Sequence, residues 1–250
     1  MDIAFLFLTG IVGVIAGMAS GYFGIGGGSI RIPLLNLIGF TLITSYAINL
    51  ITLPVSSLIG AMSQRQNIDP KLGVYLILGG AIGTIIGTEI ALDIAASALL
   101  LAIIFLVVSV ISVIAMNLHN LIPKKSEEIA PSFNNLVGGT LLFNTLTGMR
   151  GGSEGSLFVP LQRLVNVEMH KAIATALFAA IFTSIVGAFL YWGHGQLLLL
   201  PGLIVLIGST IGARLGSLFS LHTKSKLLEV GLTTIILILA GIPMLRLFLQ

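Results

Sequence analysis

Long apolar stretches separated by short polar segments run through the whole chain. Most are about twenty residues long, the length that a helix needs to cross the hydrocarbon core of a membrane. The pattern predicts spanning helices over residues 42–62, 72–90, 95–118, 171–192, 197–219 and 227–248. Two further helices, 3–20 and 134–147, each run into a group of glycines, and the chain resumes as short helices over 29–39 and 156–164.

The two glycine interruptions are copies of one another. The segment Gly24-Ile25-Gly26-Gly27-Gly28-Ser29-Ile30-Arg31-Ile32-Pro33 returns in altered form 127 residues later, over 151–160. Lipid offers no water to satisfy the freed backbone groups, so such a break persists only where protein or a wet cavity surrounds it. A duplicated break inside apolar helices therefore points to the binding site of a transporter.

The repeat extends beyond the glycine segments. Residues that recur at a spacing of 127 or 129 are Pro33-Leu34 with Pro160-Leu161, Ser57 with Ser184, Gly60-Ala61 with Gly187-Ala188, and Gly79, Gly83 and Gly87 with Gly208, Gly212 and Gly216. A glycine at every fourth residue leaves a smooth stripe along which two helices can approach closely. We expect these glycines to serve helix packing.

The basic residues predict how the segments cross the membrane. If each interrupted segment enters and returns as a re-entrant hairpin, eight basic residues fall on one side and only Arg246 on the other. The eight are Arg65, Lys71, Lys124, Lys125, Arg163, Lys171, Lys224 and Lys226. If each interrupted segment crosses once, the same residues divide evenly. Because cytoplasmic loops carry an excess of Lys and Arg, the hairpin arrangement is favoured.

This arrangement gives three full crossings in each half, so the second half is inverted relative to the first. We expect an all-α polytopic membrane protein with two inverted repeats, residues 1–118 and 134–250, each a glycine-broken hairpin plus three spanning helices. A cytoplasmic linker, 119–133, joins them. Both termini are expected on the extracytoplasmic side of the inner membrane.

Composition agrees with a membrane protein. The chain is 56% hydrophobic and 8% charged, with a mean hydropathy of +1.10, whereas soluble domains carry about 25% charged residues. Cysteine is absent, which excludes disulfides and thiolate metal sites. The sequence shows no metal-ligand spacing, nucleotide-binding motif or nucleophile–base pair. We therefore expect no metal, cofactor, enzymatic activity or nucleic-acid partner.

The residues after each glycine group predict an anion cradle. Ser29 and Ser156 are placed as helix N-caps, and Pro33 and Pro160 in or near the first turn. A helix N-terminus offers unpaired N–H groups and the positive end of the helix dipole, which suit an anion. We expect the two hairpins to meet near the midplane of the membrane, with the two cradles facing each other.

Charged and amide side chains near the breaks have more than one reading each. Arg31 and Arg150 bind the substrate, form a structural ion pair, or snorkel towards the membrane surface, and Glu154 is either an ion-pair partner or a proton carrier. Asn49 and Asn144 either line the cavity or tie helices together. His170 is an interfacial residue or a proton relay. The candidate substrate-binding residues are Gly26, Gly27, Gly28, Ser29, Arg31, Asn49, Asn144, Arg150, Gly151, Gly152, Ser153, Gly155 and Ser156, and the proton-coupling candidates are Glu154 and His170.

Four segments resemble a known family. They are the first glycine motif running to Pro33-Leu34-Leu35, its second copy over 148–161, the stretch 170–176, and the stretch 208–216, which ends in Gly-Ala-Arg-Leu-Gly. Together they resemble the sulfite exporter TauE/SafE family of membrane proteins over almost the whole chain. The resemblance implies transport of small sulfur-containing anions, such as sulfite, sulfoacetate or other organosulfonates, across a bacterial or archaeal inner membrane. Arg150 and Glu154 depart from the smaller or apolar residues expected there, so the substrate can differ from sulfite.

The leading interpretation is a secondary transporter that works by alternating access and draws on a gradient. Its expected partners are a small anionic substrate and the lipid bilayer, and a homodimer is left open. The alternatives are an anion channel, whose re-entrant loops would form an open filter, and a carrier for non-sulfur anions such as carboxylates.

Overall fold

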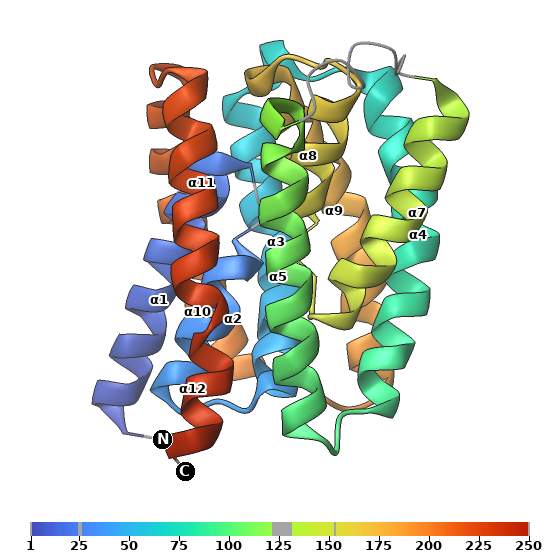
Figure 1. The fold of residues 1–250 in the computed structure, drawn as a ribbon. Helices are drawn as coiled ribbons and strands as arrows, with labels where there is room; N and C mark the ends of the chain where they lie inside the picture. The colour runs from blue at the N-terminus through green and yellow to red at the C-terminus, as the bar shows by residue number, and fades with distance from the viewer. Residues whose placement is uncertain (1, 25–26, 122–131, 153, 250) are drawn as a thin grey trace.

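The computed structural model describes residues 2–24, 27–121, 132–152 and 154–249, and these residues form a bundle of helices without a strand (Figure 1). The order of the helices is α1 (Ile3–Phe23), α2 (Gly28–Ile38), α3 (Leu42–Ser63), the 3-10 turn η1 (Arg65–Asn67), α4 (Pro70–Asp93), α5 (Ala98–Leu121), α7 (Phe133–Met149), α8 (Gly155–Leu164), α9 (Met169–Gly193), α10 (Leu199–Leu221), α11 (Ser225–Ala240) and α12 (Ile242–Leu249). The expectation of an all-helical chain is confirmed for this part of the protein.

Seven segments of the described chain are long and apolar enough to span a membrane. Six correspond to the predicted crossings, and the last of these runs over both α11 and α12. The seventh is α1, whose 21 residues extend about 31 Å at 1.5 Å per residue. Large apolar side chains such as Ile3 and Phe248 are 87% and 80% exposed, as lipid-facing residues are. The protein is a multi-pass membrane protein.

Both interrupted segments fold back as helical hairpins. The ring of Phe40, just after α2, lies 5.0 Å from the ring of Phe5 near the beginning of α1. In the second hairpin, a Cβ atom built on Gly139 of α7 would lie 2.7 Å from the side chain of Leu161 of α8. Each hairpin therefore begins and ends at the same end of the bundle. Figure 1 shows α1–α2 entering from the end that carries both termini, and α7–α8 entering from the opposite end.

We call these ends the N/C end and the basic end. The basic end holds the loops 64–69, 165–168 and 222–224, and contacts at their edges show that these loops lie at the same end of the bundle. Lys171 Nζ lies 2.7 Å from the carboxylate of Asp69, and His170 Nε2 lies 3.2 Å from the Thr223 carbonyl oxygen. The described members of the predicted one-sided set thus gather at one end, and Arg246 lies in α12 at the other.

Two pairs of helices pack backbone to backbone and run parallel. Gly13 of α1 lies against Val205 of α10, and Gly17 lies against Ser209. Further along the chain, Gly83 of α4 lies against Leu141 of α7 in the same manner, as do Gly79 and Gly87 against residues one turn earlier and later. The glycine stripes serve the close packing that the sequence predicted.

Several predicted boundaries change. The last predicted helix is divided at Gly241, because Pro243 cannot donate the hydrogen bond that would continue α11. Helix α5 extends to Leu121 and α7 begins at Phe133, so both enter the predicted linker 119–133. Residues 122–131 of that linker lie outside the described part, and the division into two repeats stays a prediction.

Candidate functional site

The N-caps of the two short helices lie at equivalent positions of the repeat, two residues earlier than the predicted caps. Gly27, with a φ of 75°, is the N-cap of α2, and Glu154, 127 residues later, is the N-cap of α8. The expectation that Ser29 and Ser156 are N-caps is therefore wrong. Each serine lies inside the first turn of its helix, and the two hydroxyls accept from the same side chain.

That shared partner is Arg150, which is fully buried. Its Nη2 donates to the hydroxyls of Ser29, at 3.0 Å, and Ser156. Its Nη1 donates to Ser109 Oγ at 2.9 Å. The guanidinium carbon also lies 5.5 Å from the centroid of the Phe105 ring, within the range of a cation–π contact. The hydroxyls come from α2, α5 and α8, so this cluster joins elements that are distant in the sequence.

Arg31 forms a second buried cluster. Its Nη1 donates to Asn49 Oδ1 at 2.6 Å, and its Nη2 donates to Ser209 Oγ at 3.0 Å. Ser209 in turn donates to the carbonyl oxygen of Gly13 at 3.0 Å. Arg31 on α2 is therefore bound to α3 and α10, and through Ser209 to α1.

Asn49 connects the two arginine clusters. Its Nδ2 donates to the carbonyl oxygen of Gly151 at 2.8 Å, next to Arg150 in the chain. Gly151 has a φ of 80°, and an added Cβ would overlap the ring of Tyr46. The second break is thus held against α3 by one hydrogen bond and one tight contact.

Both guanidinium groups lie near mid-height in the bundle. Ser109 is in the middle of α5 (Ala98–Leu121), and Ser209 is in the middle of α10 (Leu199–Leu221). The two glycine breaks lie beyond this level, each towards the end of the bundle opposite the one from which its hairpin enters. A Cβ on Gly24 would lie 2.7 Å from Ile173 Cγ2 in the second turn of α9, while Tyr46 is in the second turn of α3. The hairpin tips therefore pass each other instead of meeting at the midplane, because the 21 residues of α1 extend past the midplane towards the basic end.

Asn144 lies apart from the arginines and ties α7 to α4. Its Nδ2 donates to the carbonyl oxygen of Gly80 at 2.7 Å and to Thr84 Oγ1 at 2.6 Å. Its Oδ1 accepts a bond of 2.7 Å from Thr147. The amide is fully occupied by helix contacts, which agrees with the second of its two predicted readings.

The two proton-coupling candidates lie in different places. Glu154 is 1% exposed, close enough to Arg150 for an electrostatic interaction, and its Oε1 faces Gly152. His170 is at the beginning of α9, where Nδ1 lies 3.2 Å from Glu168. It belongs to the basic end and not to the arginine clusters.

The remaining glycine candidates line the breaks. An added Cβ on Gly27 would lie 3.1 Å from Arg31 Nη2, and one on Gly152 would lie 2.9 Å from Leu50. Gly28 and Gly155 are the first residues of α2 and α8. Gly26 and Ser153 lie outside the described residues.

Sequence reasoning missed four residues of these clusters: Ser109, Ser209, Tyr46 and Phe105. None belongs to the two glycine interruptions, although Ser209 lies within the glycine stripe of α10, and each lies inside a long apolar helix. A usable signal did exist for the serines, because a polar side chain within a spanning helix usually faces the interior of the bundle. Which of several such serines would reach an arginine depends on how the helices pack.

The comparison with known families agrees with these features. The family described as sulfite exporter TauE/SafE matches residues 9–244, nearly the whole chain. The chain belongs to the TauE/SafE family. Members of this family are membrane transporters of sulfur-containing anions, so the match supports a small anionic substrate for this TauE/SafE protein. No curated protein and no solved structure matches the chain.

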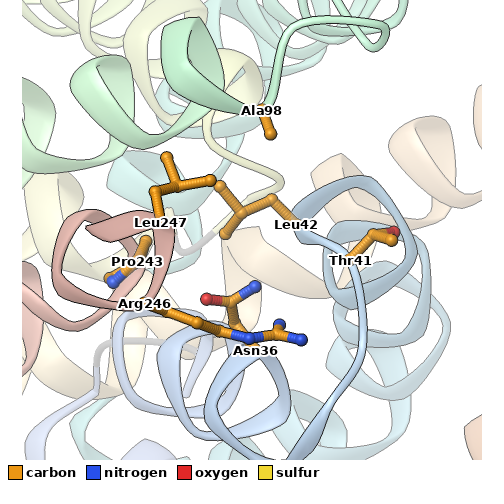
Figure 2. Close-up of a pocket in the computed structure, with 7 residues that line it drawn as sticks. All are labelled: Asn36, Thr41, Leu42, Ala98, Pro243, Arg246 and Leu247. Atoms are coloured by element: carbon orange, nitrogen blue, oxygen red, sulfur yellow. The ribbon is translucent and has the colours of Figure 1, made fainter. Parts of the chain in front are cut away.

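A separate cavity of about 120 Å³ opens at the N/C end of this TauE/SafE protein (Figure 2). Arg246 and Asn36 line it, and both donate to the carbonyl oxygen of Phe40, at 2.6 and 3.0 Å. Its other lining residues are Thr41, Leu42, Ala98, Pro243 and Leu247. Arg31 and Arg150 do not line this cavity and are 0% exposed, so both arginine clusters are closed to the outside in this conformation.

Proposed function

We propose that this protein is a secondary transporter that carries a small sulfur-containing anion across the inner membrane by alternating access, with Arg150 as its anion-binding residue. The observation that carries the proposal is the set of three hydroxyls that meet the guanidinium of Arg150 at mid-height. A buried arginine is costly inside a membrane protein and is a functional candidate by default.

The hydroxyl cluster suits an oxyanion because each hydroxyl both accepts and donates. In this structure the hydroxyl oxygens of Ser29, Ser109 and Ser156 accept from Arg150. When an anion takes their place on the guanidinium, the same hydroxyls can rotate and donate to its oxygens. Sulfite and sulfonates present several oxygens on one sulfur, which matches a guanidinium surrounded by several donors. Family membership favours sulfur-containing anions over carboxylates.

Two closed contacts support alternating access. Gly24 lies against Ile173 near the basic end, and Gly151 lies against Tyr46 near the N/C end. The two contacts are related by the same spacing of 127 residues, which is the relation expected of inverted repeats. We infer that each contact closes one side of the site, and that transport opens them in turn.

The parallel helix pairs agree with an inverted repeat. Helix α1 packs on α10, and α7 packs on α4, so each half packs its first helix against a helix of the other half. The repeat relates α1 to α7 and α4 to α10, which makes the two pairs equivalent. The basic end is then the cytoplasmic end by the positive-inside rule, and the N/C end is extracytoplasmic.

Thermal-shift assays of the purified protein test Arg150. Sulfite, sulfate, thiosulfate, sulfoacetate and small carboxylates are added in turn, and the anion that raises the unfolding temperature most is taken forward. We expect Arg150→Ala to remove that rise, and Ser109→Ala to weaken it while preserving the fold. Arg65→Ala, which removes an exposed charge, is the matched control and should leave the rise intact. An undiminished rise in Arg150→Ala would refute the assignment.

Proteoliposomes test the transport mechanism. A carrier shows saturable counterflow, in which unlabelled anion on one side drives labelled anion from the other. Large, unsaturable anion currents would instead establish a channel and reject alternating access.

A further inference from the structure

Three aromatic residues fill the space between Arg150 and the N/C end. Tyr46 on α3, Phe105 on α5 and Tyr191 on α9 are all 0% exposed and pack in one apolar cluster with Leu101 and Leu42. The ring of Phe105 contacts Arg150 on one side of the cluster. On the other side, Leu42 lines the cavity of Figure 2. The cluster therefore separates the buried arginine from the cavity.

The two tyrosine hydroxyls in this cluster are poorly satisfied. Among the described residues, the hydroxyl of Tyr191 is buried without a hydrogen-bond partner. Within the same part of the chain, the hydroxyl of Tyr46 has only a long contact of 3.4 Å with the carbonyl oxygen of Leu101. Phenylalanine would fill the same space without this cost, because a buried O–H that lacks an acceptor is destabilising. An acceptor that arrives only during transport would account for both hydroxyls.

The repeat-related positions on the opposite side of the site carry no tyrosine. The positions 127 residues away from Tyr46 and Tyr191 are Ile173 and Gln64. Ile173 has no polar atom, and the side-chain amide of Gln64 already donates to the carbonyl oxygen of Gly21 at 3.1 Å. The basic side does hold buried serine hydroxyls without a partner among the described residues, those of Ser20 and Ser220, but it has no phenol at the two repeat-related positions.

We propose that Tyr46 and Tyr191 form a second anion-binding station on the path between Arg150 and the cavity at the N/C end. The inference rests on the proposed function, since it concerns the same transported oxyanion. When the Gly151–Tyr46 contact opens, the two phenols donate to the oxygens of the anion as it leaves or approaches Arg150. Neutral donors bind an anion more weakly than a guanidinium does, so the anion dissociates from the station quickly and continues along the path.

The test separates the station from the arginine site by measuring two quantities for each variant. Equilibrium binding is measured from the anion-dependent thermal shift, and exchange is measured in proteoliposomes with the same anion on both sides. For Tyr191→Phe we expect exchange to slow about tenfold, the size of one lost hydrogen bond to a charged group, while binding changes less than about twofold. Tyr46→Phe should slow exchange in the same direction.

Tyr75→Phe is the matched control. It removes one phenol oxygen from a partly buried tyrosine of α4 that packs on Phe133, outside the cluster. It should exchange at the wild-type rate. The station is disproved if Tyr46→Phe and Tyr191→Phe also exchange at that rate while Arg150→Ala loses binding, a result that leaves the proposed function standing. Loss of equilibrium binding in folded Tyr191→Phe would place its hydroxyl in the arginine site and also reject a separate station. If Arg150→Ala keeps its binding, the proposed function itself fails.

Discussion

Arg31 and Arg150 are both fully buried, but their partners differ in kind. Arg31 donates to Asn49 and Ser209, which are themselves bound to the backbone of Gly151 and Gly13. Arg150 donates to three serine hydroxyls, and one of these, Ser109, also donates to the carbonyl oxygen of Phe105 at 2.6 Å. Arg31 is thus part of a fixed network that positions the second break. The partners of Arg150 are all hydroxyls, and a hydroxyl can exchange its present acceptor for a ligand oxygen by rotation about one bond.

A prediction at the residue scale concerns Gly151. Its φ of 80° is costly for alanine, and the added Cβ would overlap Tyr46. We expect Gly151→Ala to lower the free energy of unfolding by more than about 2 kcal/mol, measured as a fall in the unfolding temperature. Gly138→Ala, in α7 with open space around its Cβ, is the control and should be neutral or stabilising. Equal effects of the two changes would show that the tight contact is unimportant.

A second prediction at this scale concerns Glu154. The carboxylate is buried beside Arg150 and is the candidate proton carrier. We expect Glu154→Gln to bind the anion but to lose the dependence of uptake on external pH, because glutamine cannot titrate. Uptake is measured in proteoliposomes across a series of pH values. A variant profile that coincides with the wild-type profile would remove Glu154 as proton carrier and leave it a structural residue.

At the scale of elements, the basic end is closed by contacts between helix beginnings. Asp69 caps α4 by accepting from the Leu72 N–H at 3.1 Å, and its carboxylate pairs with Lys171 of α9. Its backbone N–H also donates to Thr175 Oγ1 at 3.0 Å. Asp69 therefore links α4 to α9 across the two proposed repeats, on the side that the Gly24–Ile173 contact closes.

This link predicts a dependence of stability on pH. Partial burial by itself raises the pKa of Asp69, but the hydrogen bond and charge of Lys171 and the N–H groups of Leu72 and Lys71 outweigh it, so the pKa lies below its ordinary value. A carboxyl with a lowered folded-state pKa stabilises the protein above its ordinary pKa of about 3.9, and this stabilisation is lost as pH falls through the lowered value. We expect the difference in unfolding temperature between wild type and Asp69→Asn to be constant near neutral pH and to shrink in acid. A difference that stays constant below pH 4 would contradict the ion pair.

At the scale of the whole molecule, the two hairpins enter from opposite ends, and the described basic residues outside the hairpin interiors gather mainly at one of them. Because the natural chain contains no cysteine, single cysteines can report on this topology without background. Gln66→Cys lies at the basic end and Ala96→Cys at the N/C end, and both positions are exposed. We expect a membrane-impermeant thiol reagent added outside intact cells to label Ala96→Cys, and Gln66→Cys only after permeabilisation. Labelling of both from outside would reject the proposed orientation.

The sequence by itself determined that the chain is a helical membrane protein, because apolar stretches of spanning length leave no other way to satisfy the backbone in lipid. It also located both breaks and the buried Arg31, Arg150 and Glu154, since glycines and charges are conspicuous within apolar helices. The N-caps of the two short helices were predicted two residues too late, because a serine inside the first turn cannot be told from a serine N-cap by residue type alone. Only the tertiary structure decided that the two serines serve Arg150, that Ser109 and Ser209 complete the clusters, and that Tyr46 lies against Gly151. These partners come from helices distant in the sequence, and their rotation and depth are set by how the helices pack, which no local pattern encodes.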